Sequence, residues 1–136
     1  MTFSTVLTPR FYETDALGHI NNAAIAAWFE VVRIQWLESR TGAPVGIDRN
    51  WVLASLKLDF ITETFYGTDV EARVIGAKVG NSSLTVHCEM LQDDRLTVRG
   101  IAVLVHVDLD AKRSLPIPDA LRASLADVPA PPEDRR

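Results

Sequence analysis

The stretch RFYETDALGHINNAAIAAWFEVVR, residues 10–33, decides the fold, because it joins a polar loop to an amphipathic helix. Asn21 and Asn22 are residue types that begin helices, since their side chains accept hydrogen bonds from the first backbone N–H groups. Beyond them, apolar residues recur at the four- and three-residue steps of one helical face. The positions on this face are Ile25, Phe29, Val32 and Trp36. Gly42 and Pro44 form a common stop signal, so we expect the helix to end near them.

Outside this helix the apolar residues follow the period of two that is typical of β-strands. Residues 3–12 predict a first strand, in which Pro9 marks an edge position or an irregularity. Further alternating stretches follow the helix at residues 56–60, 70–74, 84–90 and 97–107. Turn signals, Gly-Asn at 80–81 and Asp-Asp at 93–94, separate the later ones. This order predicts an α+β domain, with one long helix against a mostly antiparallel sheet.

The stretch at residues 97–107 is apolar on both of its faces. One face carries Val98, Ala102 and Leu104, and the other carries Ile101, Val103, Val105 and Val107. A single helix covers only one face of a sheet, so another layer or subunit has to cover the other face. We therefore expect a homodimer or a homotetramer.

Length and composition restrict the classes of protein to which the chain can belong. With 136 residues, 47% of them hydrophobic, the chain can form one domain with a substantial core. The net charge of −4 and the scattered basic residues argue against nucleic-acid binding. Cys88 is the single cysteine, which excludes an internal disulfide, and no Cys/His cluster predicts a metal site. We expect activity without a metal or a cofactor.

The two ends of the chain lead to expectations about location and domain boundaries. The amino end lacks the basic head and apolar stretch of a secretory signal, and no segment has the length of a membrane span. This predicts a soluble, cytoplasmic protein with no membrane partner. We expect the single domain to occupy residues 1–128. Residues 129–136 are rich in proline and charge and have little to bury, so we expect a disordered tail.

Other side chains are interpreted from their neighbours. Cys88 alternates with apolar residues, so we expect a small buried hydrophobic side chain, not a nucleophile. Glu30 and Arg33 stand three residues apart on the helix and predict a local ion pair. His87 and His106 are expected at surface or interface positions.

The loop between the first strand and the helix concentrates the groups that carry chemistry. The first N–H groups of a helix lack partners within it and lie at the positive end of the helix dipole. Amides near Asn21 and Asn22 can therefore hold a carbonyl oxygen that gains negative charge. Asp15 lies within a few residues of them, and Gly18 permits the tight turn that brings carboxylate and amides together. The plainer alternative is that Asp15 turns the loop or caps the helix, and that both asparagines are caps.

This loop closely resembles the D-x-x-G-H-V-N-N signature of the 4-hydroxybenzoyl-CoA thioesterase family, in which it follows an aromatic strand and precedes a long helix. The carboxy-terminal segments RSLPIP and DALRASL also look like the closing segment of many members. The resemblance implies the hotdog fold, an antiparallel sheet wrapped around one long central helix. It also implies two subunits that pair their sheets and form active sites at their interface.

The resemblance further implies roles for residues of the loop. Asp15 matches the catalytic carboxylate of the family, and the backbone of Asn22 matches the amide that polarises the thioester carbonyl. His19 matches a position that is catalytic in some branches and structural in others. Two positions depart from relatives, because Leu17 stands where plant acyl-carrier-protein thioesterases have asparagine and Ile25 where many relatives have tyrosine.

We therefore predict a thioesterase that hydrolyses an acyl-CoA or a related acyl-thioester. The departing thiolate needs little help from a general acid, because a thiol such as that of cysteine has a pKa of about 8.5. Asp15 acts either as a general base on water or as a nucleophile on the carbonyl. The expected substrate-binding residues are Gly18, Asn21 and Lys57, with Lys57 among the basic side chains available for the phosphates of coenzyme A.

Two other functions are compatible with the same fold. The first, from a different class, is a non-catalytic hotdog protein that binds or senses an acyl-thioester. The second is a hotdog dehydratase, but the sequence offers no convincing His/Glu arrangement for that reaction. The presence of Asp15 favours hydrolysis over binding alone.

Overall fold

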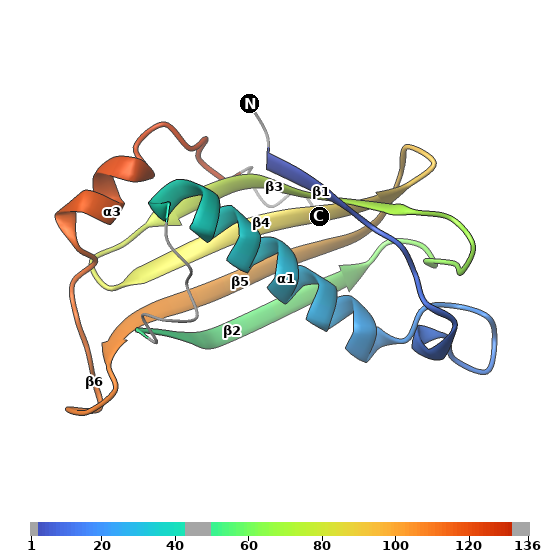
Figure 1. The fold of residues 1–136 in the computed structure, drawn as a ribbon, viewed down its shortest axis with the longest axis horizontal. Coiled ribbons are helices and arrows are strands. Elements are labelled where there is room, and N and C mark those ends of the chain that lie inside the picture. Colours follow the sequence, from blue (N-terminus) through green and yellow to red (C-terminus); the bar gives the residue numbers. More distant parts are fainter. Residues whose placement is uncertain (1–2, 43–49, 132–136) are drawn as a thin grey trace.

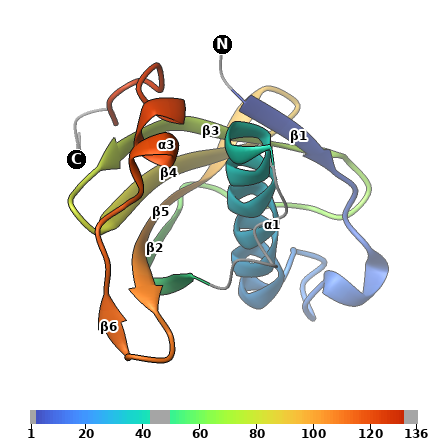
Figure 2. The same cartoon turned by 60° about the vertical axis from the view of Figure 1, so that its left-hand side comes forward.

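A computed structural model describes residues 3–42 and 50–131 of the chain. The elements in chain order are β1 (Phe3–Leu7), η1 (Phe11–Glu13), α1 (Asn22–Thr41), β2 (Trp51–Phe60), β3 (Val70–Val79), β4 (Ser83–Gln92), β5 (Arg95–Asp108), β6 (Arg113–Ser114) and α3 (Asp119–Ser124). The strands form an antiparallel sheet in the order β1-β3-β4-β5-β2, and β6 pairs with the end of β5. Figures 1 and 2 show this sheet curving around α1, which confirms the predicted fold class.

The helix α1 begins and ends where its sequence signals predicted. Asn21 is the N-cap, and its side-chain oxygen accepts a hydrogen bond of 2.8 Å from the backbone N–H of Ala23. At the other end Gly42 has a φ of 71°, and its N–H donates to the carbonyl oxygen of Glu38 at 2.8 Å. Glycine suits this position because it lacks the Cβ that disfavours a positive φ. Pro44 lies outside the described residues.

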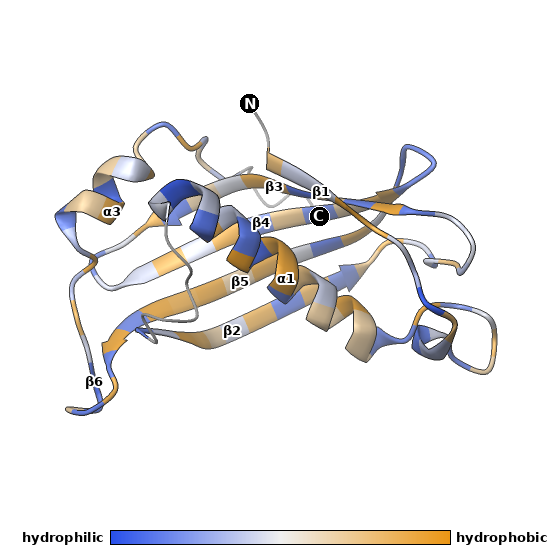
Figure 3. Ribbon diagram, viewed as in Figure 1, coloured by the Kyte–Doolittle hydropathy of each residue, from blue (hydrophilic) through white to orange (hydrophobic). Residues whose placement is uncertain are grey.

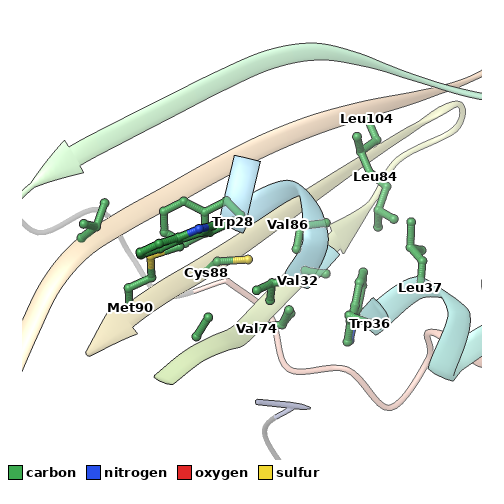
Figure 4. Packing of buried hydrophobic residues seen from close by; sticks show 14 of the residues in the cluster. Trp28, Val32, Trp36, Leu37, Val74, Leu84, Val86, Cys88, Met90 and Leu104 are labelled. Carbon is green, nitrogen blue, oxygen red and sulfur yellow. The ribbon is translucent and has the colours of Figure 1, made fainter. Parts of the chain in front are cut away.

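The core lies between α1 and the concave face of the sheet. The helix contributes Ile25, Trp28, Phe29, Val32, Trp36 and Leu37. The sheet contributes alternate residues of β3, β4 and β5, of which Val86, Met90 and Val98 are fully buried. Figure 4 shows Trp28 of α1 beside Cys88 and Met90 of β4. Full burial of such a side chain contributes about 1.5–3 kcal/mol, so this contact holds the helix against the sheet.

Gly100 lies on the face of β5 that meets the helix. A Cβ at this position would lie 3.2 Å from ring atoms of Phe29 and 3.3 Å from a methyl carbon of Leu58. Glycine therefore leaves the room in which the Phe29 ring packs against the strand. Because side chains alternate along a strand, the residues on either side of Gly100 point to the opposite, convex face.

The convex face of the sheet carries the second apolar side of β5. Ile101, Val103, Val105 and Val107 remain partly exposed there, so the predicted two-sided pattern of this strand is confirmed. Figure 3 shows hydrophobic residues along much of β5. Within the described residues β2 forms the edge of the sheet beside β5, and it exposes Val52.

The first strand is shorter than the sequence predicted. β1 ends at Leu7, and residues 11–13 form the short 3-10 helix η1 instead of extending the strand to residue 12. Pro9 gives the physical reason, because proline lacks the N–H that the ladder requires. The chain therefore leaves the sheet before the loop that contains Asp15.

Two expectations about polar side chains were wrong. Arg33 is only 4% exposed, and no ion pair joins it to Glu30 within the described residues. Burial lowers the pKa of its guanidinium, which Cys88 and Glu30 raise only in part. His106 is 7% exposed instead of lying at the surface, because it shares the inward parity of Leu104 on β5. Arg33 follows the buried Phe29 by four residues on the helix, and His106 follows the buried Leu104 by two residues on the strand.

Residues 129–131, after α3, lie against β3, and the domain boundary at residue 128 with a disordered tail stays a prediction. The carbonyl oxygen of Pro129 accepts a hydrogen bond of 3.0 Å from the N–H of Ala77 on β3. A register shift between Val74 and Gly76 interrupts the pairing of β3 with β4, and a Cβ at Gly76 would lie 2.9 Å from the Ala130 carbonyl oxygen. The register shift and the absence of a Cβ at Gly76 thus leave room for residues 129–131 beside β3. Residues 132–136 lie outside the described part.

Candidate active site

The loop from Thr14 to Ile20, which we call the Asp15 loop, connects η1 to the start of α1. An isolated antiparallel bridge joins Thr14 to Ile20 and closes the loop at its base. Inside it the N–H of Asp15 donates to the carbonyl oxygen of His19 at 2.8 Å, and Gly18 has a φ of 79°. The tight turn predicted at Gly18 is therefore present. Figure 1 shows this segment at the same end of the molecule as the first turn of α1.

The carboxylate of Asp15 is exposed and uses one of its two oxygens to hold the loop. Oδ1 accepts hydrogen bonds from the backbone N–H groups of Leu17, at 2.8 Å, and His19, at 3.2 Å. No residue in the described ranges donates a hydrogen bond to Oδ2. Asp15 does not cap the helix, because Asn21 has that role. The arrangement orients the carboxylate and leaves one oxygen accessible for chemistry.

The first turn of α1 offers a backbone donor next to this loop. Asn22 is the first helical residue, and the N–H of Ile25 is the first to bond back to the carbonyl oxygen of Asn21, at 3.2 Å. The N–H of Ala23 is taken by the Asn21 side chain. In the described part of the chain nothing accepts a hydrogen bond from the N–H of Asn22. Such an amide at the positive end of the helix can bind a developing oxyanion.

His19 contacts the chain that follows β2. It forms an isolated antiparallel bridge with Phe65, and the two rings meet edge to face with centroids 5.1 Å apart. The adjacent N–H of Ile20 donates to the carbonyl oxygen of Thr64 at 2.8 Å. Gln92 is a buried residue at the end of β4. Its side-chain oxygen accepts a hydrogen bond from the Phe65 N–H at 2.9 Å, and its side-chain NH₂ donates to the Phe65 carbonyl oxygen at 2.8 Å. The segment around Phe65 thus supports the Asp15 loop from one side.

Glu13 holds the other side of the loop, and sequence reasoning missed it. Its two carboxylate oxygens accept hydrogen bonds from the Arg10 backbone N–H, at 2.8 Å, and from the indole N–H of Trp28, at 2.7 Å. Its carbonyl oxygen accepts from the N–H of Asn21 at 2.7 Å. The three-residue spacing from Arg10 to Glu13 was the one available signal, since it is the spacing of a helix-capping pair.

Aromatic and aliphatic side chains surround the Asp15 loop without being buried. The rings of Phe11 and Tyr66 meet edge to face with centroids 5.9 Å apart, and both side chains are exposed. Tyr12, Leu17 and Phe65 are exposed as well. Contiguous exposed apolar residues mark surfaces that bind a ligand or another chain.

The structure brings together five of the six predicted site residues. Asp15, Gly18, His19, Asn21 and Asn22 lie in or directly after the Asp15 loop. Their roles in catalysis and substrate binding stay predictions.

Lys57 is the exception. It pairs with Ile101 on the convex face of the sheet and lies 3.8 Å from the carboxylate of Asp59. Its expected contact with coenzyme A stays a prediction. Within residues 3–42 and 50–131 no three His, Cys, Asp or Glu side chains gather where they could hold a metal ion.

Comparison with known proteins identifies the class to which this fold and loop belong. The model of the thioesterase-like superfamily matches residues 9–125, and the chain belongs to this superfamily. A predicted thioesterase from Bacillus stearothermophilus has a structure with a TM-score of 0.88 and 34% sequence identity, covering 98% of this chain and 100% of that chain. The predicted hotdog thioesterase family is thereby confirmed.

Two further relatives extend the comparison. A thioesterase from Thermus thermophilus, solved in complex with coenzyme A and Zn, has a TM-score of 0.81 and 27% identity over 90% of each chain. YsmA, an uncharacterised protein of Bacillus subtilis strain 168, is 28% identical over 126 residues, which cover 91% of this chain and 85% of YsmA. In general terms, the superfamily and the two thioesterase structures support acyl-CoA thioester hydrolysis. No helix in the described part of the chain is long and apolar enough to cross a bilayer.

Proposed function

We propose that this protein hydrolyses an acyl-CoA, or a related acyl-thioester, to a carboxylic acid and a free thiol, with Asp15 as the catalytic carboxylate. One observation carries the proposal. Two backbone N–H groups orient the Asp15 carboxylate through Oδ1, in a loop that leads directly into the first turn of α1. Membership of the thioesterase-like superfamily supports the assignment of this loop as the reacting site.

In the proposed reaction the thioester carbonyl oxygen accepts a hydrogen bond from the N–H of Asn22. Asp15 removes a proton from water while the water oxygen attacks the carbonyl carbon, and the tetrahedral intermediate expels the thiolate, which then takes up a proton. Alternatively, Asp15 attacks the carbon itself and expels the thiolate, and water then hydrolyses the mixed anhydride. A thiol has a pKa of about 8.5, so neither route needs a dedicated general acid.

The apolar surroundings of the Asp15 loop support an acyl-thioester over a small polar substrate. Phe11, Leu17 and Tyr66 expose apolar surface beside the loop. An acyl chain buried against such side chains contributes about 0.8 kcal/mol for each CH₂ group removed from water. The same surface supports the contribution of a second subunit to the site.

The test is an assay of purified protein with short, long and aromatic acyl-CoAs, in which release of free thiol is followed. Asp15→Asn keeps the size of the side chain and removes its charge, so kcat should fall at least about a hundredfold with little change in KM. Asp110→Asn, at an exposed turn after β5, is the matched control and should retain the parent rate. Equal rates for parent and Asp15→Asn would overturn the role of Asp15.

The principal alternative is a protein that binds an acyl-thioester without hydrolysing it. The same purified proteins distinguish the two functions, because a binding protein would retain an acyl-CoA in equilibrium dialysis and release no thiol. The presence of an accessible Asp15 oxygen beside the helix start favours hydrolysis.

We further propose that the working form is a dimer or a tetramer. The exposed apolar residues of β2 and the partly exposed convex face of β5 support this, because both lie where a second chain can cover them. Sedimentation velocity in the concentration range of the assay should give a species of at least two chains. A stable monomer with full activity would contradict this proposal.

A further inference from the structure

The most unusual polar contact outside the reacting groups joins Glu13 to Trp28. Their sequence positions are fifteen residues apart, and the carboxylate and the indole N–H form a hydrogen bond of 2.7 Å. Trp28 lies in the second turn of α1 and is only 7% exposed, so its ring is part of the core. A buried indole N–H needs an acceptor, and a carboxylate is a strong one.

Glu13 connects three segments at once. Besides Trp28 it contacts the backbone of Arg10, where the chain leaves β1, and the backbone of Asn21, the cap of α1. Asp15 follows Glu13 by two residues, and its loop closes between Thr14 and Ile20. Glu13 therefore stands at the junction between the Asp15 loop and the helix whose first amide faces the substrate in the proposed reaction.

We propose that Glu13 is a positioning residue for Asp15. Its hydrogen bond to Trp28 fixes the base of the Asp15 loop against α1, so that the Asp15 carboxylate and the Asn22 amide keep the separation that one reacting carbon requires. This inference rests on the proposed function. A displacement of about 1 Å between reacting groups can cost about a hundredfold in rate, so a bond that fixes such a junction has a measurable effect on kcat.

A merely structural role for Glu13 makes a different prediction. If the carboxylate only satisfied the indole N–H, its loss would lower thermal stability and leave kcat of the folded protein unchanged. A positioning role lowers kcat in protein that is fully folded at the assay temperature. The kcat of protein shown to be fully folded at the assay temperature therefore separates the two roles.

The experiment compares Glu13→Gln, Trp28→Phe and the double variant. Glu13→Gln has one amide oxygen in place of two carboxylate oxygens, so its side chain cannot accept from both the Arg10 N–H and the indole N–H of Trp28. Trp28→Phe removes the donor and keeps an aromatic ring in the core. Each single variant should lower kcat by about 10- to 100-fold with KM changed little.

The double variant should be no slower than the slower single variant, because both substitutions disrupt the same arrangement, in which Glu13 accepts from Arg10 and Trp28 together. Glu38→Gln, near the opposite end of α1, is the matched control and should retain the parent kcat. Multiplicative losses in the double variant, or a parent-like kcat in folded Glu13→Gln, would overturn the proposal.

A second measurement does not depend on activity. Hydrogen exchange of the ligand-free protein should be faster over residues 14–21 in Glu13→Gln than in the parent, and unchanged in Glu38→Gln. If the parent hydrolyses no thioester, the proposed function fails and this exchange measurement still tests the positioning contact. Unchanged exchange in Glu13→Gln would show that Glu13 does not fix the loop.

Discussion

The Asp15 loop and the core beneath α1 hold their potentially reactive side chains in opposite surroundings. Asp15 is exposed, oriented by two backbone N–H groups and left with one accessible oxygen. Cys88 lies on β4 in the core beneath α1, where burial raises the pKa of its thiol to about 12. A thiolate is the better nucleophile, yet the fold keeps this thiol neutral and inaccessible. The comparison teaches that surroundings, more than residue type, select the reactive group.

The difference originates in the backbone. In the core β4 pairs with β3 on one side and β5 on the other, so most of its backbone polar groups have partners in the two ladders. At the start of α1 the helix necessarily leaves backbone donors without partners inside it. The loop that precedes such a start can therefore combine a carboxylate with free amides, which a position such as Cys88 in mid-strand cannot.

The largest expected effect concerns Cys88 itself. Because burial raises the pKa of this thiol to about 12, the folded protein holds it neutral at pH 8. The thiolate fraction, and with it the alkylation rate by iodoacetamide, should be lower by about a thousandfold than for an ordinary thiol, at tenfold per pH unit. Protein unfolded in urea is the control and should react at the ordinary rate. Rapid alkylation of the native protein would contradict the claim that the core keeps the Cys88 thiol neutral and inaccessible.

A pair of leucine substitutions measures the contrast in stability. Leu84 is 0% exposed in β4, whereas Leu17 in the Asp15 loop is 77% exposed. Leu84→Ala should lower the free energy of unfolding by about 2–5 kcal/mol, because it leaves a cavity in the core. Leu17→Ala should change it by less than about 0.5 kcal/mol. Urea denaturation measures both, and an equally large loss for Leu17→Ala would indicate that a second subunit buries the loop.

A smaller loss of stability is expected when the N-cap of α1, next to the Asp15 loop, is removed. Asn21→Ala removes the acceptor of the Ala23 N–H and should cost about 1 kcal/mol of stability, within a range of about 0.5–2. Asn21→Asp keeps an acceptor there and should retain most of that stability. Asn22→Ala is the matched control, because Asn22 is already inside the helix. Urea denaturation measures the three variants. If Asn22→Ala lowers the denaturation midpoint more than Asn21→Ala does, Asn21 is not the residue that caps the helix.

Local patterns in the sequence determined the elements of this protein and the content of its loop. The step of three and four residues predicted α1, and the asparagine pair and Gly42 predicted its ends, because capping depends on residues that are neighbours in the chain. Alternation predicted the apolar faces of β3 and β4 that the structure buries, whereas β5 is apolar on both faces and only the structure shows which one meets α1. The signature around Asp15 predicted the family, which the superfamily match confirms.

Only the tertiary structure decided which residues support that loop. The bonds of Glu13 to Trp28 and of Gln92 to Phe65 join residues that no periodicity relates, since their approach depends on how the sheet curves around α1. The burial of Arg33 and the contact of residues 129–131 with β3 have the same origin. Hydrogen-bonding capacity is a local property of a residue, but the choice of partner follows from packing, which the whole chain determines at once.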